Sequence, residues 1–581
     1  MTTATAIPTP APPDVASIDV LIDGSAISGE FQILSASVSR ELNRVPSASV
    51  QLLDGEASKQ TFAASDTDHF VPGRAIEIQL GYRGQTQKVF SGIIVANRVR
   101  VRDSGTMLWL ECRDKAVRMT SGLHSRYYTA TTDAAILDEL VGRYGLERSV
   151  AATKPTLPEV VQFDATDWDF VVCRAEANGH VVVVRDGKVT VGPPATAAKP
   201  VVTAAFGATV LELDAEIDAR WQAKGITARA WSAADQQLVV ADASEPSVTA
   251  SGNLAVDQLS AVFGGEAHVL RHAGRLGEPE LQAWADGRLL KDRLAKVRGR
   301  IRFQGFAGVS AGDVIEVGGI GKRFAGLQYV SGVRHTFAGG NWETDAAFGL
   351  PPEPHAARYP VSALPAGGLL PGVNGLQIGV VTALEGDPDG EDRVRVRVPL
   401  IGDTDDGVWA RLATLDAGDQ RGTCFRPEID DEVVVGFLDA DPRFPVVLGQ
   451  LHSSARPAPV PGSDDNHVKG YVSRSKLALR FDDEKSTITL ETAAGNELTL
   501  SEDAKAVSLA DQNGNSITLD DAGITLTSAK DLIIKAAGDV KVEGNGVEVK
   551  AQGAFKASGQ SGAEVSSSAT LTIKGSLVQL N

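Results

Sequence analysis

The 581-residue chain has few cysteines and no cluster of basic residues. Its three cysteines, Cys112, Cys173 and Cys424, follow no metal or redox spacing, and an odd number argues against a disulfide scaffold. We therefore expect the chain to fold in a reducing compartment. The formal net charge is −18, and lysines and arginines form no run longer than isolated pairs, which argues against nucleic acid as a partner.

Membrane and export signals are also missing. The sequence has no run of 18 apolar residues, so no transmembrane helix is expected. Residues 1–17 are rich in Pro, Ala and Thr and lack a basic start and an apolar stretch, which predicts a flexible tail and no signal peptide. We expect assembly in the cytoplasm and, if the protein leaves the cell, release by another route.

A repeat of short apolar pairs occupies the C-terminal region. The pairs recur every seven or eight residues and are Ile524/Leu526, Leu532/Ile534, Val540/Val542, Val547/Val549, Phe555/Ala557, Ala563/Val565, Leu571/Ile573 and Val578/Leu580. Residues two apart share one face of a strand, so each unit is a short strand followed by a polar turn. Such a unit must stack on copies of itself, which predicts a β-helix or β-prism. The period alone does not distinguish one chain from several.

Longer units precede this repeat. The pairs Ile488/Leu490, Leu498/Leu500, Val507/Leu509 and Ile517/Leu519 recur every nine or ten residues, with Gly-Asn turns at 495–496 and 514–515. This spacing indicates longer strands and wider turns, so the rod is expected to begin broad and to narrow.

The rest of the chain divides by composition and periodicity. Residues 18–120 are strand-like. Residues 121–195 contain two helices, the first capped by Thr132 or Asp133 and the second near Thr166, and a hairpin at Asp186–Gly187. Strands return over 196–355, where one helix begins near Pro279. Residues 356–375 and 456–470 are Pro-, Gly- and Ser-containing linkers, 376–455 are dense in strands, and 471–581 hold the repeats.

Four motifs in fixed order carry a family resemblance. "RVRVRVPL", "VWARLAT", "PEIDDEVVVGF" and "DPRFPVVLGQL" resemble the OB-fold module of contractile-injection spike proteins. These proteins are the VgrG spikes of type VI secretion and the hub-spike proteins of phage baseplates and extracellular contractile particles. "VFSGIIVANRV" and "DWDFVVCRAEANGHVVVVRDGKVTVGP" resemble their hub, and "LRFDDEKSTITLETAAGNELTL" and "IKGSLVQLN" resemble the start and end of their needle. The hub resembles that of extracellular particles more closely than that of type VI spikes.

The resemblance implies a mainly β fold: a hub of two β-barrels with helical insertions, an OB-fold barrel and an intertwined triple-stranded β-helix formed as a homotrimer. Two barrels per chain, at about 18–120 and 196–355, would give six barrels in the trimer. The implied function is that of a spike joining a hexameric inner tube and its baseplate to a membrane-piercing needle. A PAAR-like tip protein and effector cargo are the other implied partners, and no cofactor is implied.

Two sets of site residues follow from the resemblance and the repeat. The trimer needle core is expected to contain Ile524, Leu526, Leu532, Ile534, Val540, Val542, Val547, Val549, Leu571, Ile573, Val578 and Leu580. The tip-protein site is expected at Ser576, Leu577, Val578, Gln579, Leu580 and Asn581.

Two other functions remain alternatives. An enzyme-bearing spike would need a catalytic domain before or after the needle, but only about twenty residues separate Leu451 from Tyr471 and only Asn581 follows the last pair. A trimeric adhesin fibre would carry a receptor-binding head. We therefore expect this chain not to be an enzyme. We also expect no metal site in the needle, since no His lies beyond His467 and no Cys beyond Cys424.

Three motif matches are interpreted as turns or loops. "GVSAG" around Ser310 fits an esterase pattern but is followed by a strand-like sequence where a helix is required. "GGIGKR" at 318–323 lacks the spacing of a phosphate loop and has no Ser or Thr after its lysine. The carboxylates at 428–432 are expected in a solvated loop.

Overall fold

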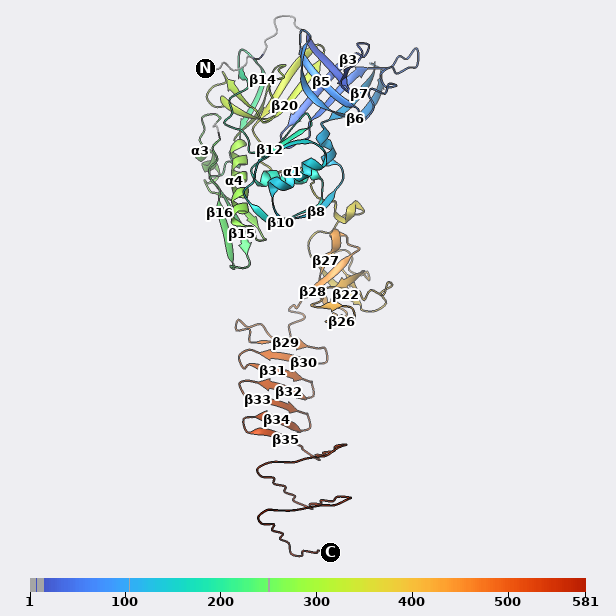
Figure 1. The fold of residues 1–581 in the computed structure, drawn as a ribbon, viewed down its shortest axis with the longest axis vertical. Helices are drawn as coiled ribbons and strands as arrows, with labels where there is room; N and C mark the ends of the chain where they lie inside the picture. The colour runs from blue at the N-terminus through green and yellow to red at the C-terminus, as the bar shows by residue number, and fades with distance from the viewer. Residues whose placement is uncertain (1–6, 8–14, 104, 249–250, 581) are drawn as a thin grey trace. The chain divides into compact units, whose positions relative to one another are not determined.

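A computed structural model describes residue 7 and residues 15–103, 105–248 and 251–580 (Figure 1). The chain divides into two compact units, one of residues 1–373 with 439–441 and one of residues 374–438 with 442–581. No helix in the described part of the chain is long and apolar enough to cross a lipid bilayer.

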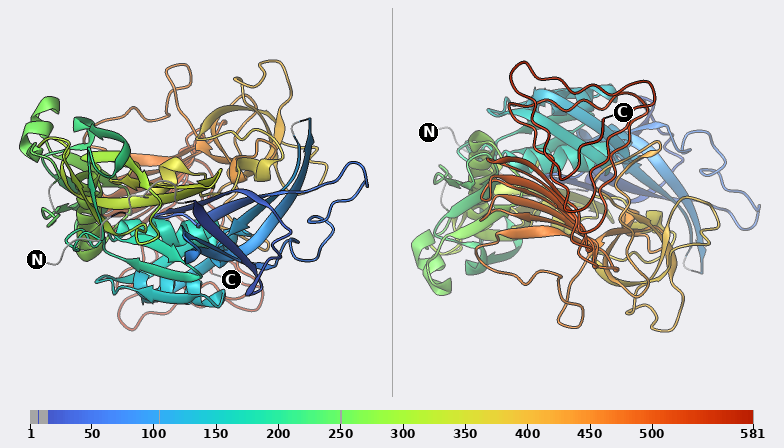
Figure 2. Two further views of the ribbon diagram at one scale, coloured as in Figure 1. Left: turned by 90° about the horizontal axis from the view of Figure 1, so that it is seen from above. Right: turned by 90° about the horizontal axis from the view of Figure 1, so that it is seen from below.

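A 13-stranded sheet is the core of the N-terminal unit. Eleven of its strands follow one path in the order β14-β18-β21-β20-β3-β4-β7-β6-β5-β1-β2, and β13 and β19 branch from β20. Its strands are β1 (Ala16–Ile22), β2 (Ser25–Ala26), β3 (Ile33–Glu41), β4 (Ser47–Leu53), β5 (Ala75–Tyr82), β6 (Gln85–Arg102), β7 (Gly105–Arg113), β13 (Thr203–Ala205), β14 (Val210–Ile217), β18 (Val297–Gln304), β19 (Val314–Gly318), β20 (Gly326–Ala338) and β21 (Asn341–Phe348). In Figure 2, left, the blue strands of residues 16–113 and the green strands lie on opposite sides of this unit.

The two expected hub barrels are not separate sheets. Strands β3 and β20 pair antiparallel from Glu41 opposite Gly332 to Ser35 opposite Ala338. This pairing joins the strands of 18–120, expected to form one hub barrel, to those of 196–355, expected to form the other. Two apolar clusters still form. One surrounds Phe90 and Leu110 and also includes Phe337 of β20 and Trp342 of β21, and the other surrounds Phe303 and Ile315.

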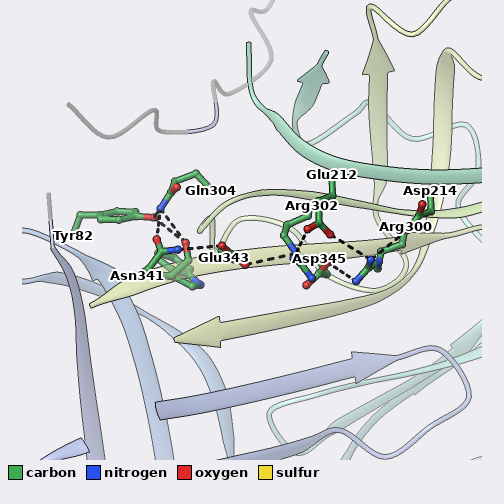
Figure 3. A network of polar contacts seen from close by, with 10 residues as sticks. Tyr82, Glu212, Asp214, Arg300, Arg302, Gln304, Asn341, Glu343 and Asp345 are labelled. Atoms are coloured by element: carbon green, nitrogen blue, oxygen red, sulfur yellow. Dashed lines mark hydrogen bonds and ion pairs between the residues drawn. The ribbon is translucent and has the colours of Figure 1, made fainter. Parts of the chain in front are cut away.

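The face of this sheet that points away from the apolar clusters is polar. On β3 and β4, Ser37 lies opposite Ser49 and Ser39 opposite Ser47, whereas Val38 and Val50 on the other face are fully buried. An ion-pair ladder continues this face across β14, β18 and β21 (Figure 3). This alternation of buried apolar and outward polar residues is what a sheet with one packed face requires.

A helical insertion follows β7. Its elements are η1 (Lys115–Thr120), β8 (His124–Thr132), α1 (Asp133–Arg143), β9 (Glu147–Val150), β10 (Thr156–Ala165), α2 (Asp167–Ala177), β11 (Val181–Arg185) and β12 (Lys188–Gly192). Thr132 caps α1 by accepting from the N–H of Ala135, and Thr166 caps α2 by accepting from the N–H of Asp169. Both predicted helix starts are therefore confirmed, as is the β11–β12 hairpin at Asp186–Gly187.

A second insertion interrupts the strands of 196–355, which the sequence had placed in one barrel. Its elements are η2 (Ala219–Trp221), β15 (Ile226–Ser232), β16 (Gln237–Asp242), α3 (Val256–Ser260), η3 (Ala261–Phe263), β17 (His268–His272) and α4 (Glu278–Leu294). Strands β16, β15 and β17 form their own sheet, and α4 packs against it through Leu281, Ala285 and Leu289. This part of 196–355 is thus a separate α+β layer. Helices α5 (His355–Arg358) and η4 (Pro365–Gly368) end the unit.

The OB-fold region is a closed five-stranded barrel. Its strands are β22 (Gln377–Ala383), β23 (Val394–Arg397), β24 (Val408–Leu412), β27 (Glu432–Phe437) and β28 (Pro445–Gln450), with β25 (Ala417–Gly418), β26 (Arg421–Gly422) and η5 (Leu438–Ala440) in its loops. Valines at 381, 394, 396, 433, 435 and 447 are fully buried and fill its interior.

The C-terminal repeats begin as an antiparallel meander. Its strands are β29 (Val468–Val472), β30 (Ala478–Asp482), β31 (Thr487–Glu491), β32 (Glu497–Ser501), β33 (Ala506–Ala510), β34 (Ser516–Asp520) and β35 (Gly523–Thr527). Each strand pairs with the next, as the stacked arrows of Figure 1 show. Residues 528–580, all of which are described, contain no helix and no strand.

Candidate trimerisation face

Tight turns set the register of the meander. Gly495 and Gly514 have φ of +93° and +88°, values in the left-handed region that glycine adopts without a Cβ penalty. In the second turn, Asp511 accepts from the backbone N–H groups of Asn513 and Asn515 at 2.9 Å. Hydrogen bonds from the Asn515 and Asn513 side chains and N–H groups lower the pKa of Asp511 to about 2.

This register gathers the apolar residues of the meander on one face. In one column Ile488 lies opposite Leu500, Leu500 opposite Val507, and Val507 opposite Leu519. In the other column Leu490, Leu498, Leu509 and Ile517 follow one another. We call these two columns the apolar face; its members are Tyr471, Leu479, Phe481, Ile488, Leu490, Leu498, Leu500, Val507, Leu509, Ile517, Leu519, Ile524 and Leu526.

The opposite face carries small hydroxyl side chains. Thr489, Thr499, Ser508, Thr518 and Thr525 pair in order across β31 to β35. Apart from Thr525 they are partly buried by their neighbours. On the apolar face Leu479 and Leu498 are also partly buried, and the other side chains are 36% (Ile517) to 68% (Ile524) exposed in the single chain. A strand meander that exposes its apolar side and covers its hydroxyl side is an interaction surface.

The predicted needle-core residues fall in two structural settings. Ile524 and Leu526 lie on β35, opposite Leu519 and Ile517, and so belong to the apolar face. The others lie in residues 528–580, where no strand pairs with them. Their exposed fractions range from 49% at Val578 to 87% at Leu580, with Leu532, Ile534, Val540, Val542, Val547, Val549, Leu571 and Ile573 between these values. That these residues point into the core of a trimeric needle remains a prediction.

The predicted tip residues are at the end of the described chain. Leu577 and Leu580 are 83% and 87% exposed, and Ser576 and Gln579 are also exposed. Asn581 lies outside the described residues. The structure therefore leaves apolar side chains open at this end, and it does not itself show what binds them.

Three members of the apolar face were missed by the sequence analysis. Tyr471, Leu479 and Phe481 extend the two columns onto β29 and β30, ahead of the first pair read from the sequence. Leu479/Phe481 precede Ile488/Leu490 by nine residues and so follow the same period, whereas on β29 Lys469 stands where the first apolar residue of a pair would be. Tyr471 also contacts Phe425 of the OB-fold loop, with ring centroids 4.8 Å apart, and Arg474 forms an ion pair with Glu428 at 3.0 Å.

The motif matches are turns or loops in the structure. The backbone N–H of Ser310 donates to Asp313 at 2.8 Å, and strand β19, not a helix, follows at Val314. Burial raises the pKa of Asp313. Gly319 and Gly321 have positive φ in the loop between β19 and β20. Glu428 and Asp431 pair with Arg474 and Arg456 on the surface.

In the described part of the chain no group of three or more His, Cys, Asp or Glu side chains is arranged to hold a metal ion. Cys112 is buried, which raises the pKa of its thiol to about 12, and burial raises that of Cys173 to about 11.

Three family models match the chain. Residues 12–339, more than half of its length, match the Alg8 N-terminal domain. Residues 377–452 match the type VI secretion system/phage-baseplate injector OB domain, and residues 487–556 match the phage baseplate V C-terminal trimerisation domain. The trimerisation match begins at β31 and covers the meander and part of the unpaired segment.

Curated relatives are similar over a short stretch. The type VI secretion system spike protein VgrG4b of Pseudomonas aeruginosa is 33% identical over 138 residues, 22% of this chain and 15% of the relative. VgrG3 of Vibrio cholerae is 28% identical over 138 residues, 22% of this chain and 13% of the relative. The matched stretches thus span less than a sixth of these relatives.

A solved tail protein from Neisseria meningitidis is 16% identical to the chain, with a TM-score of 0.44, covering 59% of this chain and 98% of that one.

Proposed function

The chain belongs to the family defined by the Alg8 N-terminal domain and, through its OB and trimerisation domains, to the VgrG and phage-baseplate spike proteins, and on this premise we propose that it forms the homotrimeric hub and spike of a contractile injection machine. In this proposal the N-terminal unit is the hub and the C-terminal repeats form a three-chain needle.

The apolar face carries the proposal. It has thirteen members, and its large side chains are roughly half exposed in one chain. Burying the rest of a large apolar side chain contributes about 1 kcal/mol each, so complete burial would contribute on the order of 10 kcal/mol per chain. That value is comparable with the whole stability of a typical domain. Two further copies of the same face, packed about a three-fold axis, would cover it and provide neighbours for residues 528–580.

The needle would pierce a membrane, and the hub would meet a hexameric inner tube and its baseplate. Support comes from the two apolar clusters of the hub sheet, because two lobes per chain would give six in a trimer. Effector cargo would be carried by the same assembly, which would form in the cytoplasm and be delivered or released on contraction. We favour a machine of the extracellular phage-tail-like type.

We propose no catalytic role for this chain. Between the OB barrel and the meander, residues 451–467 contain no helix or strand, so no folded domain is inserted there. This observation weighs against a wall-degrading domain at that position, and binding of the isolated trimer to a glycan array would favour the adhesin alternative.

The exposed residues 576–580 and Asn581 would bind a PAAR-like tip protein through apolar contact and strand pairing. The test mixes the full-length spike with a PAAR-repeat protein and measures affinity by calorimetry. Deleting residues 577–581 should abolish binding and leave the spike trimeric. A matched control is Lys574→Ala, which leaves the terminal apolar residues in place and should bind normally. Unchanged affinity after the deletion would refute this assignment.

A further inference from the structure

A cavity of about 180 Å³ lies within the N-terminal unit. One wall is formed by residues 293–297, where α4 ends and β18 begins, and another by the β19–β20 hairpin of the main sheet. The third wall comes from residues 245–248 and 251–256, which lead from β16 into α3 and which we call the roof. The second insertion and the main sheet therefore enclose a space that neither forms alone.

The roof is attached to the β19–β20 hairpin. The hydroxyl of Ser251 donates to Gln328 at 3.0 Å, and the backbone N–H of Gly252 donates to the carbonyl oxygen of Ala325 at 3.2 Å. Gly252 has a φ of +68°, and a Cβ at this position would lie 2.1 Å from the carbonyl oxygen of Arg323, so no larger residue fits. The close approach of the roof to the main sheet is thus built into the sequence.

Lys296 brings a buried positive charge to the cavity. The residue is 8% exposed, and its Nζ donates to the carbonyl oxygen of Leu254 in the roof at 3.3 Å. None of the described carboxylates forms an ion pair with it. Burial and the neighbouring Arg293 both lower the pKa of Lys296. Buried charges in proteins are ordinarily paired, and an ammonium group has three N–H donors, so this lysine has donors left for a further partner.

Glu245 does not supply that partner. Among the described residues that line the cavity it is the one carboxylate, and Arg293 already pairs with it through two nitrogens, Nε at 2.6 Å and Nη2 at 2.9 Å. The remaining nitrogen of Arg293, Nη1, donates to the carbonyl oxygen of Ala223 at 3.0 Å. The charges of Arg293 and Glu245 therefore cancel, and the cavity retains the positive charge of Lys296.

A hydroxyl donor and apolar side chains complete the lining. Tyr329 is 7% exposed and lines the cavity, and its hydroxyl has no hydrogen-bond partner among the described residues. Burial and the nearby charge of Asp313 raise the pKa of this hydroxyl, so it stays protonated and able to donate. The apolar lining includes Val248, Val256, Leu294, Val297, Val314 and Leu327. An unpaired cation, a hydroxyl donor and an apolar side match a ligand with a single anionic group on a small apolar body.

We propose that this cavity binds a small monocarboxylate. The carboxylate would accept hydrogen bonds from Lys296 and Tyr329, and the apolar body of the ligand would pack against the valines and leucines of the lining. Charge-assisted hydrogen bonds are stronger than neutral ones, so the anionic group is the main determinant of affinity. A cavity of about 150 Å³ is enough to hold benzene, so this one has room for such a ring with a carboxylate. The inference goes beyond the proposed function, because the proposed needle uses none of these residues.

Benzoate is a probe of this size and charge, and calorimetry with the full-length protein measures its affinity. We expect saturable binding of one benzoate per chain. Benzyl alcohol has the same ring without the charge and should bind at least about tenfold more weakly, because it cannot form an ion pair with Lys296. Inorganic phosphate has charge without the apolar body and should show no saturable binding. Equal affinity of the protein for benzoate and either comparison ligand would overturn the proposal.

Two lysine variants distinguish this cavity from other binding positions. Lys296→Met keeps the length of the side chain, removes its charge, and should lower the affinity for benzoate at least about tenfold. The control Lys322→Met removes an exposed lysine of the loop between β19 and β20 and should bind benzoate as the unmodified chain does. Unchanged affinity in Lys296→Met would overturn the assignment.

A crystal structure with para-bromobenzoate tests the location in the unmodified chain, so this test does not depend on the folding of a variant. The bromine should give an anomalous-scattering peak inside the cavity, with the carboxylate beside Nζ of Lys296. A peak elsewhere, or none, would overturn the site. A trimer that binds no benzoate would overturn the site and leave the proposed homotrimer standing, whereas a monomer that binds benzoate would support the site and contradict the homotrimer.

Discussion

The meander of residues 468–527 and the segment of residues 528–580 have similar apolar pairs and different structures in a single chain. In the meander every strand pairs with a neighbouring strand of the same chain. The backbone is therefore hydrogen-bonded, and only the apolar face lacks a partner. In the segment after it, no strand forms and the apolar residues are 49% to 87% exposed. The step length alone does not separate the two regions, because Ile524 follows Ile517 by only seven residues and their strands still pair as the β34–β35 hairpin.

This difference indicates an order of assembly. Hairpin contacts are close in sequence and form early, so the meander can take shape in each chain and then associate through its apolar face. Residues 528–580 have no partner strand of their own and would pair only after three chains are aligned. The meander would thus fix the register that the later segment follows.

The largest effect is expected from Leu500→Asp. In the proposed trimer this change buries three carboxylates near one axis, where desolvation and mutual repulsion add, and we expect loss of the trimer. The control is Thr499→Asp, one residue away on the hydroxyl face, which should remain trimeric. Light scattering measures both, and a trimeric Leu500→Asp protein would contradict the assigned faces.

A smaller effect is expected from Ile534→Asp or Val540→Asp. These charges would enter the needle below the meander, so the trimer should persist while residues 528–580 lose resistance to protease. Lys541→Asp, at the alternate position beside Val540, should keep that resistance. Wild-type digestion of both Asp variants would show that the inward residues are misassigned.

Gly514→Ala should lower stability modestly. A Cβ at φ +88° lowers the free energy of unfolding by roughly 1 kcal/mol in each chain, because the left-handed region is strained for residues with a Cβ. The melting temperature of the trimer should fall by a few degrees. Gly538→Ala, whose added methyl would meet nothing within 4 Å, should leave it nearly unchanged.

The smallest effect concerns pH. The pKa of Asp511 is about 2 in the folded chain, below its ordinary value of 3.8. Because the folded pKa is depressed, its stabilising contribution is present above about pH 4 and is lost as the pH falls toward 2. Asp511→Asn should therefore reduce the loss of meander stability between pH 4 and pH 2, measured by thermal melting. An identical pH profile in the variant would show that this turn is not coupled to stability.

Local features of the fold were predictable from the sequence. The caps at Thr132 and Thr166, the Asp186–Gly187 hairpin and the shared face of pairs such as Ile488/Leu490 depend on residues close in the chain. Each follows from capping chemistry, turn chemistry or the two-residue period of a strand. The apolar face of the meander was predictable for the same reason, since its members repeat at a regular interval.

Long-range features were not predictable. The β3–β20 pairing joins strands about 290 residues apart, and the sequence of one strand does not identify the strand with which it pairs. The second insertion escaped notice because β15, β16 and β17 have the same alternation as the strands of the main sheet.

The mass of the purified full-length protein tests the central claim most directly. Light scattering at micromolar concentration should give a single species of about 183 kDa, three times the 61.0 kDa chain. A monodisperse species of 61 kDa would mean that the apolar face is stable without partners, and it would contradict the account of the spike as a homotrimer.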